Sequence, residues 1–124
     1  MDSNISFVEH DGHARITLAG VRTPAILLAA AAQTAVECRV RGIQRFLIDV
    51  RGMRGALDTL EAYEVAGHDL LAQDGIRELV RVAVLDRHEN IVRVRFFETV
   101  AVNRGLDLKV FDDEAQAMRW LAKG

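Results

Sequence analysis

Short apolar runs alternate with helical patterns along this chain, and this alternation restricts the folds that it can adopt. Three runs have the length and the β-branched or aromatic side chains of buried strands; they span residues 46–50, 79–85 and 106–111. A segment with apolar residues at helical spacing follows each of them. Strands that alternate with helices pair in parallel through right-handed crossovers. The pattern therefore predicts an α/β fold with helices packed on a mostly parallel sheet.

The N-terminal part of the chain predicts an antiparallel addition to this sheet. Residues 5–9 and 13–19 alternate between polar and apolar side chains, as half-buried strands do. Asp11-Gly12 lies between them and supplies the backbone angles of a tight hairpin. We therefore expect a five-stranded, mixed but mostly parallel sheet with about four helices, in a single domain that spans residues 1–124.

Capping signals place the helix ends. Thr23 and Pro24 are expected at the start of the first helix, and Gly42 at its end. Asp58 and Glu61 have the spacing of a capping box at the start of the second helix. The first helix is expected to expose a polar stripe formed by Gln33, Thr34, Glu37 and Arg41. The second is expected to bury an apolar stripe formed by Leu60, Tyr63, Gly67, Leu70 and Leu71.

The composition argues against several classes of protein. The formal net charge is −2, so the chain lacks the basic footprint that duplex nucleic acid requires. Cys38 is the single cysteine, which excludes an internal disulfide and suits a reducing compartment. It is expected to be a small core residue. The N-terminus has no secretory signal pattern, and the longest apolar run, 25–32, is too short to cross a bilayer. We therefore expect a cytoplasmic protein without a transmembrane segment.

Catalytic and metal-binding patterns are not found in the sequence. The four histidines show no paired ligand spacing, and no GxSxG motif is present. Serine occurs only at Ser3 and Ser6. We therefore expect no metal, no cofactor and no enzymatic activity.

The segment RGMRG, which follows the strand at 46–50, is the first candidate for a binding site. Ligands of open α/β sheets bind beyond the carboxyl ends of the strands. Gly52 and Gly55 permit unusual backbone angles, and Arg51 and Arg54 have the charge to hold an anion. The spacing is not that of a P-loop. A solvated turn that joins a strand to a helix is the other interpretation of the same residues.

The end of the next strand adds polar residues to this edge. Asp86 and His88 follow the strand at 79–85 and are expected near Arg51 and Arg54 if the two strands pair. An ordinary polar surface turn, with Asn90 as the N-cap of the next helix, is the alternative.

Three stretches of the sequence resemble a known family. They are GIQRFLIDVRGMRG (42–55), FFETVAVNRG (96–105) and VFDDEAQAMRWL (110–121). With the N-terminal hairpin, they look like the SpoIIAA-like branch of the STAS domains, which are anti-sigma-factor antagonist-like modules and are sometimes labelled STAS/SEC14. The resemblance covers nearly the whole chain. It implies a five-stranded mixed sheet covered by helices, no consistent enzymatic activity, and binding of partner proteins.

The resemblance also draws attention to Thr59. Relatives that act as phosphorylation switches carry a serine at the start of the second helix, in an Asp-Ser-Ser-Gly-like context. The matching stretch here is ALDTLE, in which Thr59 is the nearest hydroxyl and no glycine follows. The favoured interpretation is that Asp58 caps the helix and Thr59 is a residue of its first turn; a phosphosite at Thr59 is the alternative.

These observations together predict a regulatory, protein-binding module without catalysis. The predicted contact region spans residues 51–61, and a homodimer is compatible with it. The alternative is a carrier or sensor of a small anionic, nucleotide, lipid or other apolar ligand. That function requires a cavity between the helices and the sheet, bordered by residues such as Tyr63, Phe96 and Phe97.

Overall fold

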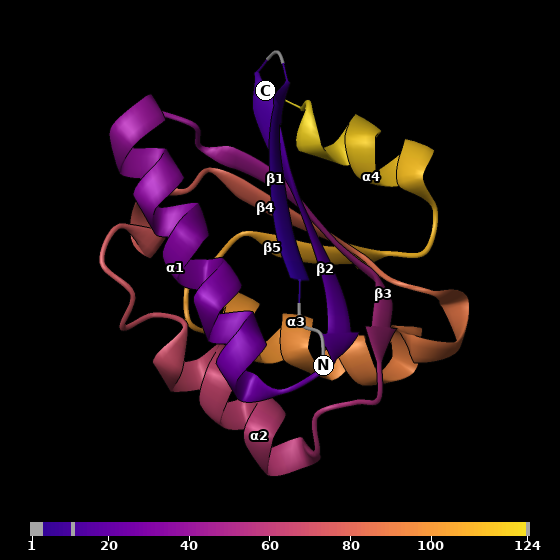
Figure 1. The fold of residues 1–124 in the computed structure, drawn as a ribbon. Coiled ribbons are helices and arrows are strands. Elements are labelled where there is room, and N and C mark those ends of the chain that lie inside the picture. Colours follow the sequence, from indigo (N-terminus) through magenta and orange to yellow (C-terminus); the bar gives the residue numbers. More distant parts are fainter. Residues whose placement is uncertain (1–3, 11, 124) are drawn as a thin grey trace.

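The computed structural model describes residues 4–10 and 12–123, which form a five-stranded sheet with helices on both faces (Figure 1). The strands lie side by side in chain order: β1 (Asn4–His10), β2 (His13–Val21), β3 (Arg45–Arg54), β4 (Arg81–Leu85) and β5 (Leu108–Phe111). β1 is antiparallel to β2, and all other neighbours are parallel. The predicted mixed, mostly parallel sheet is confirmed.

Four α-helices connect or follow the strands within the described residues, as predicted. They are α1 (Pro24–Arg41), α2 (Thr59–Glu64), α3 (Ile91–Asn103) and α4 (Glu114–Leu121). Shorter helical turns are the π-helix η1 (Val65–Asp69) and the 3₁₀ turns η2 (Ile76–Glu78) and η3 (His88–Asn90).

The helices divide the core between the two faces of the sheet. On one face, α1, α2 with η1, and α3 pack against alternate residues of the strands, among them Ile16 and Phe46. On the other face, α4 places Ala117 and Leu121 on Leu47. Figure 1 shows α4 apart from the other helices, across the sheet.

The hairpin follows the predicted pattern where the structure describes it. β1 and β2 pair in register, with His10 opposite His13 at the turn. Gly12 has a φ of 81°, in the left-handed region that a tight turn requires. Asp11, the other predicted turn residue, lies outside the described residues.

The helix α1 begins and ends where its capping residues predict. The Thr23 side chain accepts a hydrogen bond from the Ile26 amide, and Gly42 ends the helix at a φ of 71°. The burial of Thr34 corrects the prediction that it belongs to a polar stripe. It is 2% exposed, and its hydroxyl donates to the Ala30 carbonyl at 2.8 Å, so the buried position leaves no polar group unpaired. Cys38 is a buried free thiol, and burial raises its pKa.

The second helix departs from its predicted packing. Leu60 is 66% exposed and Tyr63 45% exposed, whereas Ala62, Val65 and Ala66 are buried in their place, together with Gly67 and Leu70 as predicted. The α-helix changes after Glu64 into a π-helix, whose wider turn shifts the buried face relative to a regular 3.6-residue pattern. Predicting burial from that pattern therefore failed over the first turns.

Gly67 lies where two helical segments come close together. A β-carbon placed on it would lie 3.0 Å from Val100 Cγ1 of α3. This close approach is the packing reason for a glycine inside the helix, where it otherwise costs about 1 kcal/mol relative to alanine.

Candidate functional site

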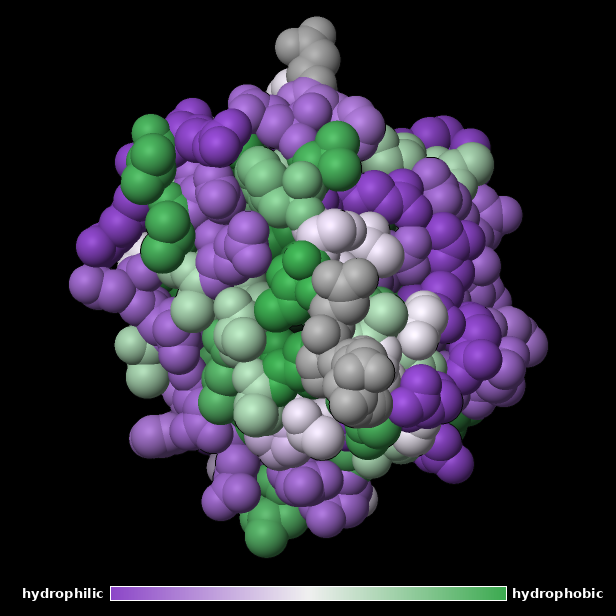
Figure 2. Space-filling model, in the orientation of Figure 1, coloured by the Kyte–Doolittle hydropathy of each residue, from purple (hydrophilic) through white to green (hydrophobic). Residues whose placement is uncertain are grey.

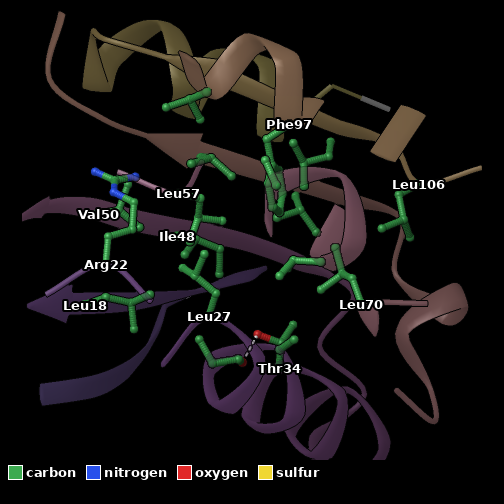
Figure 3. A pocket seen from close by; sticks show the side chains of 18 of the residues that line it. Leu18, Arg22, Leu27, Thr34, Ile48, Val50, Leu57, Leu70, Phe97 and Leu106 are labelled. Carbon is green, nitrogen blue, oxygen red and sulfur yellow. Dashed lines mark hydrogen bonds between the residues drawn. The ribbon is translucent and has the colours of Figure 1, made fainter. Parts of the chain in front are cut away.

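An apolar cavity of about 130 Å³ lies between one face of the sheet and the helices α1, α2 and α3 (Figure 3). Aliphatic side chains of the four parallel strands β2 to β5 line one wall, among them Leu18, Ile48 and Val84. The helices supply the rest of the lining, including Leu27 and Phe97. Such a cavity was the requirement for the carrier function. Phe97 lines it as expected, whereas Tyr63 and Phe96 are not part of the lining.

A buried ion pair lies at the edge of this cavity. Arg22 follows β2, and Asp86 follows β4, so both extend beyond the carboxyl ends of parallel strands. Nη1 of Arg22 is 3.0 Å from Oδ2 of Asp86, and the two side chains are 8% and 0% exposed. This contact lacks the alignment of a hydrogen bond. Oδ2 of Asp86 is therefore buried without a hydrogen-bond partner among the described residues, and so are Nε and Nη2 of Arg22.

The other oxygen of Asp86 holds the polypeptide that follows β4. Oδ1 accepts hydrogen bonds from the Arg87 amide at 2.7 Å and from Nδ2 of Asn90 at 3.0 Å. Asn90 stands at the N-cap position of α3, but its side chain makes no cap hydrogen bond there. Asn90 is therefore the N-cap residue of α3 by position, as the alternative interpretation of this segment expected, while its Nδ2 donates to Asp86.

A second charged cluster lies on the opposite face of the sheet, beside the start of α4. Asp49 of β3 is 5% exposed and receives Arg15 Nη2 at 2.6 Å and Arg51 Nη2 at 2.9 Å. Both arginines also pair with Glu114, at 3.0 and 3.1 Å. The cluster therefore ties β2, β3 and α4 together.

Electrostatics keep the two acids of this cluster charged. Burial alone would raise the pKa of Asp49, but hydrogen bonds from Arg51 and Arg15 outweigh it, and the pKa is lowered from 3.8. The hydrogen bond from Arg15 lowers the pKa of Glu114 from 4.5. The guanidinium of Arg51 is paired with Asp49 and Glu114, so both acids balance its positive charge within the cluster.

The RGMRG segment forms the end of a strand instead of a loop. Residues through Arg54 belong to β3, because a register shift between Thr17 and Ala19 lets β2 continue to pair with it, so that Ala19 lies opposite Gly52. Gly55 then turns the chain at a φ of 78°. Arg54 is exposed at this turn, and its carbonyl accepts a hydrogen bond from the Arg22 amide at 2.8 Å.

The four residues expected to cluster make different contacts. Arg51 pairs with Asp49 on one face of the sheet, Asp86 pairs with Arg22 on the other, and Arg54 is exposed. Nδ1 of His88 lies 2.6 Å from Oδ2 of Asp112, in a pair in which His88 is 89% exposed. The hydrogen bond with His88 lowers the pKa of Asp112. The structure therefore does not bring Arg51, Arg54, Asp86 and His88 into one contact network, and their role in binding stays a prediction.

The start of α2 is exposed and firmly capped. Asp58 Oδ1 accepts from the Glu61 amide at 2.8 Å, and Glu61 Oε1 accepts from the Asp58 amide at 3.0 Å, so the predicted capping box is confirmed. Thr59 and Leu60 are exposed on the first turn. Tyr63 follows one turn later, and its hydroxyl accepts from Arg104 at 3.1 Å.

Within residues 4–10 and 12–123, no group of three or more His, Cys, Asp or Glu side chains is arranged to hold a metal ion. No helix in this part of the chain is both long and apolar enough to cross a membrane.

The residues that sequence reasoning missed are Arg22 and Asp49. Asp49 had a visible signal, since it is a single acid inside the buried strand segment FLIDV. A buried acid requires charged or hydrogen-bonding partners. Arg22 had a weaker signal, which was its position directly after a parallel strand.

Comparisons with known proteins support the fold. No protein-family model matches the chain, and no curated protein matches it. An uncharacterised protein of the DUF3478 family from Shewanella loihica PV-4, with a SpoIIAA-like fold, superposes with a TM-score of 0.59 at 20% identity, over 97% of this chain and 93% of its own. An anti-sigma factor antagonist from Mycobacterium paratuberculosis superposes with a TM-score of 0.62 at 11% identity, over 98% of this chain and 96% of its own. The chain therefore has a SpoIIAA-like fold over nearly its whole length, as the sequence resemblance implied.

Proposed function

We propose that this protein is a non-catalytic regulatory module that binds a partner protein through the start of α2. The observation that carries the proposal is the exposure of Leu60 and Tyr63, at 66% and 45%, on a helix start fixed by a complete capping box. Large apolar side chains on a rigid, exposed element are typical anchors of protein interfaces, and tyrosine is enriched among binding hot spots.

The charges around these two side chains suggest the chemistry of the partner. Three acids, Asp58, Glu61 and Glu64, lie on this short helix, against one basic side chain, Arg104, that contacts Tyr63. An interface has an apolar centre and a polar rim whose charges complement the partner. We therefore infer a partner with an apolar recess bordered by Lys or Arg side chains. The likeness to an anti-sigma factor antagonist supports a regulatory role of this kind.

Affinity capture with matched variants tests this proposal. The wild-type protein, a Leu60→Ala/Tyr63→Ala variant and a Val40→Ala variant serve as baits in lysate of the source cells. Val40 is the control because it is 75% exposed on the C-terminal part of α1, where Figure 2 shows hydrophobic side chains at the surface far from α2. Circular dichroism first establishes that all three baits are folded.

The expected result is a partner protein that the wild-type and Val40→Ala baits recover in equal amounts. The Leu60→Ala/Tyr63→Ala bait should recover at least about tenfold less of it. Binding of purified partner and bait, with an affinity that falls as salt increases, would agree with the acidic rim. Equal recovery by all three baits would contradict the assignment of the surface.

A further inference from the structure

Arg22 has two buried hydrogen-bond donors for which the described part of the chain supplies no acceptor. Its side chain is 8% exposed, and neither Nε nor Nη2 has a hydrogen-bond partner there. Native proteins pair nearly all of their buried donors. Nε and Nη2 form one side of the guanidinium, and a carboxylate accepts two parallel hydrogen bonds from such a fork. The missing acceptor therefore has the geometry of an anion with two oxygens.

These donors lie at one end of the apolar cavity. Figure 3 shows Arg22 at the side of Val50 and Leu57, and Leu70 and Leu106 at the other side. Thr34 and Asn90, which also line the cavity, have partners of their own in the Ala30 carbonyl and Asp86. The cavity thus combines a long apolar wall with one polar end.

The charges of the lining favour an anion. Arg22 and Arg93 both line the cavity, and Asp86 is the acid that contacts Arg22, so the lining contributes two positive side chains against the one negative side chain paired with Arg22. Arg93 is exposed, as are Gly55 and Ala56, which also belong to the lining. The cavity is therefore lined in part by residues that are exposed at the surface, one of which is the positively charged Arg93.

The volume limits the size of the occupant. An engineered apolar cavity of about 150 Å³ binds benzene, and cavities for drug-sized ligands have about 300 Å³ or more. At about 130 Å³, this cavity accommodates an apolar group of about six carbons. A long-chain lipid is too large for it.

We propose that the cavity binds a medium-chain monocarboxylic acid of about six to eight carbons. The carboxylate of the ligand accepts hydrogen bonds from Nε and Nη2 of Arg22, and its hydrocarbon chain lies between the sheet and the helices α1 and α3. This site is separate from the exposed side chains of α2, so it would stand even if no partner protein binds there.

Calorimetric titration of the full chain tests the site with defined probes: butanoate, hexanoate, octanoate and dodecanoate, all below their micellar concentrations. Affinity is expected to rise about fourfold per methylene up to octanoate, because each buried methylene adds transfer free energy. It is expected to fall for dodecanoate, whose chain exceeds the cavity. 1-Octanol and octyl phosphate are the matched comparisons for the head group, and both are expected to bind more weakly than octanoate.

Variants assign the head group to Arg22. Arg22→Met is expected to weaken octanoate about tenfold or more and to leave 1-octanol unchanged, since it removes charge-assisted hydrogen bonds and keeps an apolar wall. Arg22→Lys retains the positive charge without the pair of parallel donors, and it replaces Arg22→Met as the test if that variant does not fold. The same loss of octanoate affinity is expected. Arg93→Ala is expected to weaken octanoate, whereas Arg95→Ala, which changes another exposed arginine of α3 outside the lining, is not.

Three results would overturn the proposal. The first is failure of octanoate to bind with a stoichiometry of one to the wild-type protein. The second is octanoate affinity that is unchanged in a folded Arg22 variant. The third is a preference for octyl phosphate or 1-octanol over octanoate, which would assign the cavity to a different head group.

Discussion

Removing the charge of Asp86 should be among the most destabilising single changes to this protein. Asp86 is fully buried, and it is the acid that contacts Arg22 in the described structure. The guanidinium of Arg22 already has two donors without a partner there. Asp86→Asn keeps the shape and an oxygen for the Arg87 amide, but leaves a buried cation without its counter-charge. Breaking a buried pair in this way costs about 3–5 kcal/mol. That is a large share of the roughly 5–15 kcal/mol that stabilise a domain.

A double-mutant cycle measured by urea unfolding separates the ion pair from other effects. Arg22→Met should cost less than Asp86→Asn, about 1–3 kcal/mol, because Asp86 retains hydrogen bonds from the Arg87 amide and Asn90. The Arg22→Met/Asp86→Asn variant should be more stable than the sum of the single losses predicts, by about 1 kcal/mol or more. Asp74→Asn is the control, since its pair with Arg39 is exposed, and it should change the free energy of unfolding by no more than about 1 kcal/mol. Additive single losses, or an Asp86→Asn loss no larger than that of the control, would refute the reasoning.

Further changes test the second charged cluster and the helix α2. Asp49→Asn should lower the melting temperature at about pH 7, and the difference from wild type should vanish in acid. The reason is that the folded state lowers the pKa of Asp49 from 3.8. Such a carboxyl stabilises the fold above its ordinary pKa, and this stabilisation is lost as the pH falls through the lowered pKa. A difference that persists at about pH 2 would contradict this assignment. Gly67→Ala should lower the melting temperature measured by calorimetry. Overpacking against Val100 costs about 1–3 kcal/mol, whereas the gain in helix propensity is about 1 kcal/mol or less. A raised melting temperature would show that α3 moves to accommodate the added methyl group. Asp58→Ala should cost about 1 kcal/mol in urea unfolding through the lost cap, whereas Thr59→Ala should change little, and the reverse order would contradict the capping assignment.

Local signals in the sequence were sufficient for the order of elements and for most helix ends. Thr23 with Gly42, and Asp58 with Glu61, act within one helical turn of their own position, so nearby residues determine their hydrogen bonds. Alternation of strands and helices likewise determined the parallel sheet. These features depend on chemistry that is local in the chain, and they were predicted correctly.

Features that depend on distant segments were not predictable in the same way. The strand β3 extends to Arg54 because a register shift in β2 provides a partner for it. Leu60 and Tyr63 are exposed on a short α-helix that continues into a π-helix, and this π-helix lies against α3, a distant segment of the chain. Arg22 and Asp86 meet only when β2 and β4 have taken their places on either side of β3. The spacing of residues in the sequence gives no direct information on such contacts between distant segments.

One segment of the chain serves both proposed sites. Leu57 and Ala62 line the cavity from the inside, whereas Thr59 and Leu60, between them in sequence, are exposed. An occupant of the cavity therefore contacts the inner side of the turn whose outer side is proposed to meet a partner. If octanoate favours one arrangement of this turn, it must change partner affinity by the same factor by which the partner changes octanoate affinity, because coupling between two binding sites is reciprocal. Titrations of each ligand with and without the other measure the two factors independently. If each ligand changes the affinity of the other by the same factor, and this factor differs from one, occupancy of the cavity regulates partner binding. If neither ligand changes the affinity of the other, the two faces of the turn act separately.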